Sequence, residues 1–223
     1  MKTTTKRRLG FLAGFALYFG ALWFMWESVV IYPLKIFVVL LHEWSHAAML
    51  MATGGTVERI VLDPNQGGAT LGRGGIPFLT LSAGYLGSLA WGALMIEAAR
   101  ARRVRAGLAN AVVGGSVLAL TLLYVRSPFG IVFGLLFGTS LILASRQLDV
   151  LWNRRLLLTL GLTSCLYAIL DIKSDVLDRP RLPSDARMLA ELTGIPTALW
   201  GGLWIAVAVA VSVLLFRRAY REA

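Results

Sequence analysis

The sequence predicts an all-α polytopic membrane protein with about six or seven transmembrane helices and a short β-hairpin at the membrane surface. Of its 223 residues, 57% are hydrophobic and only 15% are charged, and the mean hydropathy is +0.70. A soluble domain carries about 25% charged residues. The apolar residues also come in long blocks, and about 20 in a row are needed to span a bilayer. We therefore expect one multi-pass integral membrane domain over residues 1–223, located in the cell membrane.

Seven apolar blocks are long enough to be candidate spans. The first two are separated only by Glu27 and Ser28, and the fourth and fifth only by residues 126–128, so the number of crossings stays open. The first block follows a basic segment and lacks a clear cleavage site, so we interpret it as a retained span. The expected blocks lie at about residues 9–26, 28–52, 76–99, 106–125, 128–146, 156–173 and 196–216.

The charges also indicate a membrane. The formal net charge is +10, and arginines cluster between apolar blocks, as in residues 100–105, 154–155 and 217–221. Such cations are typical of membrane-flanking segments, and no basic face with interleaved aromatic residues remains outside the blocks. We expect the lipid bilayer, and no nucleic acid, among the partners. The cations divide about evenly over two sides, which leaves the orientation open, although basic segments at both ends favour an even number of crossings.

Two polar segments interrupt the apolar blocks. Residues 53–75 combine a β-branched stretch, a DPNQGG turn and a second short apolar stretch, which predicts a hairpin lying at the membrane surface. Residues 174–195 predict a loop and a short helix. Ser184 would be its N-cap, Asp185 would favour its positive end, and Gly194 would follow its last turn.

Small residues recur at four-residue spacing in two of the blocks. Such rows let helix backbones approach closely inside a membrane, so we interpret them as packing surfaces. They serve contacts within a chain as well as between chains, and the oligomeric state stays open. The rows are Gly84, Ser88 and Gly92, and Gly130, Gly134 and Gly138.

The stretch LHEWSHAAML at residues 41–50 places His42, Glu43 and His46 inside an apolar block. On a helix the two histidines project from one face, and Glu43 is offset by about 100°. This is the H-E-x-x-H pattern of zinc hydrolases, in which two imidazoles hold the ion and the glutamate takes a proton from a water on it. Ionisable groups in a span are costly, so a shared task explains them. The alternative is two histidines that bond neighbouring helices, with Glu43 facing a polar cavity.

A catalytic zinc ion needs three protein ligands and an open position, and the chain has only these two histidines. Cys165 is a poor candidate for the third ligand, which leaves carboxylates. Asp171 ends the block 156–173, and Asp175 follows one turn later. If this block runs in the same direction as the block of the histidines, Asp171 and His46 lie near the same interface. A plain helix-end carboxylate is the alternative for each aspartate.

With these motifs, the chain resembles the site-2-protease-like intramembrane zinc metallopeptidases, and it is most similar to their compact branch found in bacteria and plants. The resemblance covers most of the chain, and the series of motifs in this order is more specific than any one of them. The motifs are HEWSHA at 42–47, GGAT at 67–70, AGYLGS at 83–88, LYAILDI at 166–172 and SDARMLAELTGIPTALWGGLW at 184–204.

The resemblance implies zinc ligands at His42 and His46, a catalytic base at Glu43, and a third ligand at Asp171, the aspartate of the LD pair. Site-2 proteases proper show N-x-x-P-x-x-x-L-D-G around that aspartate. This departure leaves the third ligand open, with Asp175 as the alternative. The residues in place of Asn, Pro and Gly are Thr163, Leu166 and Ile172.

The expected function is zinc-dependent hydrolysis of a peptide bond in or near a membrane-spanning protein substrate, with Glu43 activating a zinc-bound water. A helical substrate must unwind before its carbonyls can be attacked, and a hairpin edge at residues 56–62 could hold the unwound piece as an added strand. The alternatives are a catalytically inactive membrane protein that binds metal or partner helices, and a metal transporter. Glu43 has little purpose in binding alone, and a transporter needs polar groups in several spans.

Overall fold

The computed structural model describes residues 2–25, 28–178 and 183–222 of the chain. In these residues the chain forms helices joined by short connectors, and one two-stranded antiparallel sheet. The elements are α1 (Lys2–Phe24), α2 (Tyr32–Ala52), β1 (Thr56–Asp63), β2 (Gly67–Arg73), α3 (Pro77–Arg100), α4 (Ala106–Tyr124), α5 (Pro128–Gln147), α6 (Val150–Lys173), the π-helical turn η1 (Ser174–Asp178), α7 (Asp185–Thr193) and α8 (Thr197–Glu222).

Six of the described helices, α2 to α6 and α8, are long and apolar enough to cross a membrane. The chain is therefore a multi-pass integral membrane protein, and the predicted fold class is confirmed. Three helices extend beyond the expected blocks: α1 begins at Lys2 and not near residue 9, and α8 ends at Glu222 and not near residue 216. The third is α6, which was expected from residue 156 and begins at Val150. The reason is an N-cap that the apolar pattern did not reveal, because the Asp149 side chain accepts a hydrogen bond from the Trp152 N–H at 2.8 Å.

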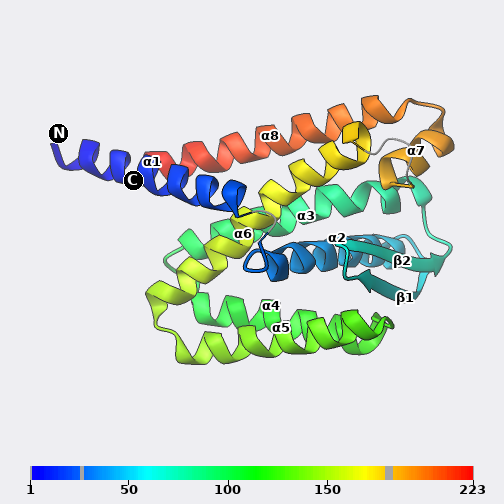
Figure 1. Cartoon of the computed structure of the whole chain (residues 1–223), viewed down its shortest axis with the longest axis horizontal. Coiled ribbons are helices and arrows are strands. Elements are labelled where there is room, and N and C mark those ends of the chain that lie inside the picture. Colours follow the sequence, from blue (N-terminus) through cyan, green and yellow to red (C-terminus); the bar gives the residue numbers. More distant parts are fainter. Residues whose placement is uncertain (1, 26–27, 179–182, 223) are drawn as a thin grey trace.

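Helix α2 lies at the centre of the molecule (Figure 1). In the apolar stretch of α2 that is long enough to span a membrane, 67% of the residues are buried by the protein, against 22% for α5 and 17% for α8. Helices α3 and α6 pack beside α2, the α4–α5 pair lies on one side of the bundle, and α8 crosses the opposite side. A helix shielded in this way can carry polar side chains that lipid contact would make costly.

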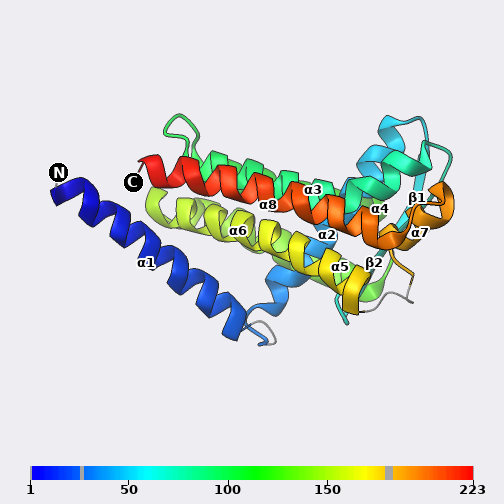
Figure 2. The same cartoon turned by 90° about the horizontal axis from the view of Figure 1, so that it is seen from above.

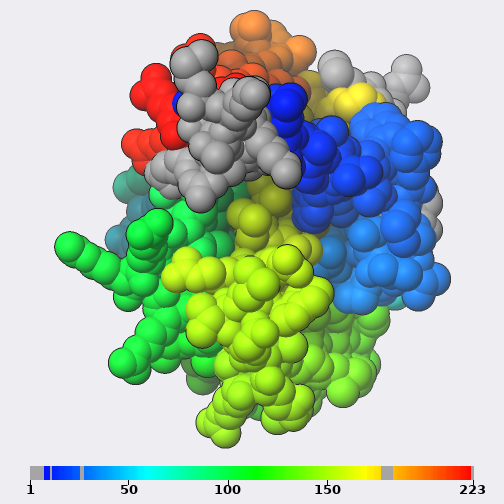
Figure 3. Space-filling model, turned by 90° about the vertical axis from the view of Figure 1, so that its left-hand side faces the viewer, coloured from blue at the N-terminus to red at the C-terminus, as the bar shows by residue number. Residues whose placement is uncertain are grey.

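Both ends of the described chain lie at the same end of the bundle (Figures 1 and 2). Helices α1 and α2 both advance toward the opposite end of the bundle in Figure 1 and meet at a wide angle in Figure 2, so they do not fold back as an antiparallel hairpin. Figure 3 views this end and shows the α3–α4 connector beside the start of α6, so the basic segments 100–105 and 154–155 lie close to both termini. An even number of crossings, which the basic termini favoured, agrees with this arrangement.

The segment between α2 and α3 forms the predicted hairpin. Its strands pair antiparallel, and Gln66 makes the turn with a positive φ of 67°. The hairpin runs back along α2: at its tip the Tyr32 hydroxyl donates to the Pro64 carbonyl oxygen at 2.6 Å, and at its base Gly72 packs against Leu50. The middle of β2 therefore lies against the middle of α2.

The outer edge of β1 is partly filled by the connector between α4 and α5. The Arg126 N–H donates to the Ile60 carbonyl oxygen at 2.9 Å, and the Leu62 N–H donates to the Ser127 hydroxyl oxygen at 2.9 Å. This connector occupies part of the edge at residues 56–62 where a substrate strand was expected to add, so that expectation is wrong for its second half. Among the described residues, no backbone hydrogen bond joins the outer edge of β2 to another segment.

The short helix predicted within residues 174–195 is α7. The Ser184 hydroxyl oxygen accepts a hydrogen bond from the Arg187 N–H at 3.3 Å, and Gly194 ends the helix with a φ of 74°. Both are the expected caps. They make Asp185 the first residue of α7, with its side chain free to project away from the helix end.

The glycine rows pack helices within this chain. A Cβ on Gly92 of α3 would lie 2.8 Å from the carbonyl oxygen of Gly161 in α6, and a Cβ on Gly138 of α5 would lie 2.9 Å from that of Gly114 in α4. Both distances are too short for any other residue type without backbone movement. The interpretation of these rows as packing surfaces is confirmed for the α3–α6 and α4–α5 pairs.

Candidate metal centre

His42 and His46 lie one turn apart on α2, and their ring centroids are 4.7 Å apart. The helix begins with Pro33 in its first turn, and no glycine or further proline interrupts it. The two side chains are 12% and 8% exposed. Local sequence therefore builds a continuous helix, and tertiary packing buries its polar face.

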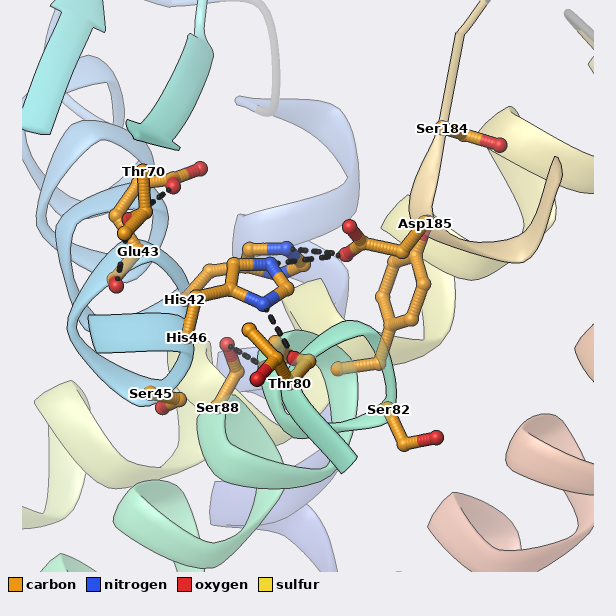
Figure 4. A network of polar contacts seen from close by, with 12 residues as sticks. His42, Glu43, Ser45, His46, Thr70, Thr80, Ser82, Ser88, Ser184 and Asp185 are labelled. Carbon is orange, nitrogen blue, oxygen red and sulfur yellow. Dashed lines mark hydrogen bonds and ion pairs between the residues drawn. The ribbon is translucent and has the colours of Figure 1, made fainter. Parts of the chain in front are cut away.

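Asp185 of α7 completes a group of three with the two histidines (Figure 4). Its Oδ2 lies 2.9 Å from His42 Nε2 and 3.0 Å from His46 Nε2, and its side chain is 11% exposed. The three atoms that could bind a metal all lie within 4.8 Å of one another. Asp185 thus meets His42 and His46 although it follows them by 143 and 139 positions in the sequence.

The outer nitrogen of the His46 ring, Nδ1, fixes the role of the inner one, Nε2. His46 Nδ1 lies 2.7 Å from the Thr80 carbonyl oxygen, and because a carbonyl only accepts, Nδ1 carries the hydrogen and donates it. The Nε2 atom of a neutral His46 then has a free lone pair, yet it faces another acceptor, Asp185 Oδ2. Two acceptors at this distance require a cation between them, either a proton or a metal ion.

The separations fit a metal ion with three protein ligands. Zinc binds histidine nitrogen and carboxylate oxygen at about 2.0–2.2 Å in a tetrahedral arrangement, which puts neighbouring ligand atoms about 3.3 Å apart. The separations from Asp185 Oδ2 to the two nitrogens, 2.9 and 3.0 Å, are close to that value. Three protein ligands leave a fourth position for a substrate or water.

Helix α3 lies directly over the two inner nitrogens. A Cβ on Gly84 would overlap the Nε2 atoms of both His42 and His46. The ring of Tyr85 packs edge-on against His42, with centroids 5.0 Å apart. Glycine at residue 84 is therefore required for these nitrogens to face the site, and this position belongs to the row that we interpreted only as a packing surface.

Glu43 points from the neighbouring side of α2 toward the hairpin (Figure 4). It is 4% exposed. The Thr70 hydroxyl lies 2.8 Å from Glu43 Oε2 and 2.9 Å from the Glu43 carbonyl oxygen. The predicted offset of this side chain from the histidines is thus present, and strand β2 covers its carboxylate.

A family model described as Peptidase M50B-like matches residues 15–215. This chain belongs to that family. The match runs from α1 into α8 and includes all the residues of the metal centre, and it confirms the resemblance to site-2-protease-like peptidases. No curated protein and no solved structure matches the chain. Membership supports a metallopeptidase in general, embedded in a membrane.

In this M50B-like protein, the two aspartates suggested by the sequence lie near the centre but in different places. Asp171 Oδ2 is 3.8 Å from His42 Nδ1, the outer nitrogen of that ring. Asp175 accepts a hydrogen bond from the Tyr85 hydroxyl at 2.6 Å. Helices α2 and α6 run in the same direction (Figure 1), which is the condition for Asp171 and His46 to lie near the same interface. The assignment of Asp171 as a metal ligand stays a prediction.

Asp185 was not recognised as a candidate ligand from the sequence of this M50B-like chain. As the residue after an N-cap serine, it already had a local role at the positive end of a short helix. Burial by itself raises the pKa of the Asp185 carboxyl, but the adjacent His46 and His42 outweigh burial and hold that pKa below its usual range. The signal that could have identified it is its place in the late motif at residues 184–204.

Proposed function

We propose that this protein is a zinc-dependent intramembrane metallopeptidase that hydrolyses a peptide bond in or near a membrane-spanning protein substrate. The observation that carries the proposal is the convergence of His42 Nε2, His46 Nε2 and Asp185 Oδ2, with Glu43 on the adjoining side of the same helix. Binding alone would need the first three residues, whereas hydrolysis also needs a base beside them.

The ligands that we propose are His42, His46 and Asp185. Asp185 is favoured as the third because its oxygen lies at ligand spacing from both inner nitrogens, whereas Asp171 faces the outer nitrogen of His42. A carboxylate on the outer nitrogen of a ligating histidine orients the ring and raises its basicity. Asp171 is the alternative third ligand, and substitution of each aspartate separates the two assignments.

A bound zinc ion would act as a Lewis acid. It would polarise the scissile carbonyl and lower the pKa of the attacking water, so that the water gives up a proton more easily. Glu43 is the proposed base: it takes a proton from the attacking water and passes it to the leaving amine. Its burial excludes bulk water, and the Thr70 hydroxyl donates to one carboxylate oxygen. The other oxygen remains to accept the proton.

The substrate would reach this site as an extended strand along β2. A helical span must unwind before its carbonyls are accessible, and an exposed sheet edge can bind the unwound piece through backbone hydrogen bonds. The edge of β1 is partly filled by the α4–α5 connector, which leaves β2. In Figure 1 β2 lies on the side of the hairpin away from that connector.

The test is a cleavage assay in proteoliposomes that hold the purified protein and a panel of single-span peptides, with products identified by mass spectrometry. We expect cleavage within or beside the apolar segments, about one zinc per chain, loss of cleavage with a chelator, and recovery with zinc. Glu43→Gln should retain zinc and lose about 10²–10⁴-fold in rate, the usual contribution of a positioned base. Cleavage by Glu43→Gln at the wild-type rate would refute the assignment of the base.

A further inference from the structure

Thr70, in the middle of β2, holds the proposed base. Its hydroxyl has one hydrogen to donate, and it lies 2.8 Å from Glu43 Oε2 and 2.9 Å from the Glu43 carbonyl oxygen. Among the described residues, it is the only side chain that donates a hydrogen bond to this carboxylate. A bond to an ionised acceptor is stronger than one between neutral groups, so the hydroxyl restricts where the carboxylate can lie.

The same strand packs against the other carboxylate oxygen. A Cβ on Gly68 would lie 2.6 Å from Glu43 Oε1, so only glycine lets β2 approach this closely. Strand β2 therefore contacts the base through a donor at residue 70 and through bare backbone at residue 68. Any shift of β2 relative to α2 would move the carboxylate or break its hydrogen bond.

The backbone N–H and C=O groups of Thr70 point away from β1. Thr70 is paired with Ile60, and the Ile60 carbonyl points away from β2 because it accepts from the Arg126 N–H. In an antiparallel pair, two opposite residues point their backbone groups either both toward each other or both away. The N–H and C=O of Thr70 therefore face the outer edge of β2, where a substrate strand would pair.

The position of Thr70 is fixed by its pairing with Ile60 of β1. Ile60 and Val125 are both 0% exposed, and they form a parallel bridge between β1 and the α4–α5 connector. This connector thus supports Ile60, and Ile60 supports Thr70 across the sheet. The residue that touches the base is held by a buried scaffold on one side and open to a substrate on the other.

We propose that Thr70 is the positioning residue that couples substrate binding to the base: its backbone pairs with the substrate strand while its hydroxyl orients Glu43 toward the attacking water. This inference rests on the proposed function, since it assumes that Glu43 acts as the base. A strand added at the edge of β2 would restrain the backbone of residue 70 and, through the hydroxyl, the carboxylate. The scissile bond and the base are then placed by a single residue.

The first test compares Thr70→Val and Thr70→Ser in the proteoliposome assay. Valine keeps the shape and the backbone but removes the donor, so kcat should fall about tenfold or more, part of what a positioned base contributes, while KM stays within about twofold. Serine keeps the hydroxyl and should restore most of kcat. The matched control is Thr121→Val, because the buried Thr121 hydroxyl donates only to Val117 of its own helix. Unchanged kcat in Thr70→Val, or equal loss in valine and serine variants, would overturn the proposal.

A second readout needs no substrate. Apparent melting temperatures in detergent are measured for wild type, Thr70→Val, Glu43→Ala and the double variant, with zinc content alongside. The valine substitution should lower the melting temperature more in wild type than in the Glu43→Ala background, and zinc content should not change. Equal shifts in both backgrounds would show that the hydroxyl does not hold the carboxylate. If wild type cleaves no peptide, the proposed function fails, and this cycle still decides whether the Thr70–Glu43 bond exists.

Discussion

The identity of the third ligand can be tested with one matched series, Asp185→Asn, Asp171→Asn and Asp149→Asn. Each change keeps the shape of the side chain and removes its charge. Asp185 Oδ2 lies 2.9 and 3.0 Å from the two inner nitrogens, whereas Asp171 Oδ2 lies 3.8 Å from an outer one. Asp149 caps α6 through Trp152, and asparagine caps a helix equally well. This third variant therefore controls for a lost carboxylate alone.

The expected size of each effect follows from the position of each carboxylate. Structural zinc sites bind with about 10–16 kcal/mol from four ligands, or about 3 kcal/mol per ligand. Loss of the Asp185 carboxylate should weaken zinc binding by about 10²–10³-fold, since about 1.4 kcal/mol is a factor of ten. Loss of an orienting carboxylate at Asp171 should cost about 10–100-fold. Asp149→Asn should bind zinc as wild type does.

The assay is competition for zinc between detergent-purified protein and a chromophoric chelator, with bound metal counted by mass spectrometry. Apparent melting temperatures of the metal-free proteins check that all variants are folded. The reasoning would be refuted if Asp185→Asn competed as well as wild type while Asp171→Asn lost its zinc. That result would assign Asp171 as the third ligand and give Asp185 a role at the end of α7 only.

Three further predictions follow from the packing and the topology. Gly84→Ala should weaken zinc binding at least about tenfold in the same competition assay, because its Cβ would overlap both inner nitrogens, whereas Gly115→Ala, with no atom within 4 Å, should not. Gly68→Ala should keep zinc but lower kcat about tenfold, because its Cβ would lie 2.6 Å from Glu43 Oε1; unchanged cleavage would contradict the tight contact. Both termini lie beside the basic segments, so the positive-inside rule predicts cytoplasmic termini, and a C-terminal reporter enzyme that works only outside the cytoplasm should be inactive.

The sequence was sufficient for the elements whose signals are local. Apolar blocks identify spans because a bilayer demands them, and Ser184 and Gly194 identify a short helix because caps are made by neighbouring residues. The pair His42 and His46 could be recognised because a helix puts them on one face. Each of these inferences uses residues that lie within a few turns of each other.

Asp185 could not be placed by such reasoning, because its contact with the histidines is set by how α7 packs. Ala186 and Leu189 of α7 are 0% exposed, and they lie in a buried apolar cluster with Tyr85 and Trp204 from two different helices. That cluster turns the first residue of α7 toward α2. A local explanation of Asp185, as a favourable charge at a helix start, was available and concealed the distant one.

The choice between the two edges of the hairpin was beyond local reasoning for a similar cause. Each strand of the hairpin has an outer edge. Strand β1 has the higher β-propensity because it contains valine and isoleucine, whereas three of the seven residues of β2 are glycine. The α4–α5 connector decides against part of β1, since Arg126 and Ser127 fill its outer hydrogen-bonding positions at Ile60 and Leu62. The strand with the weaker signal is thus the one left open, and its small residues are what allow it to lie so close to Glu43. Glycine in a strand often marks such a close approach, so the GGAT motif is better explained by the base that it covers than by the turn that it follows.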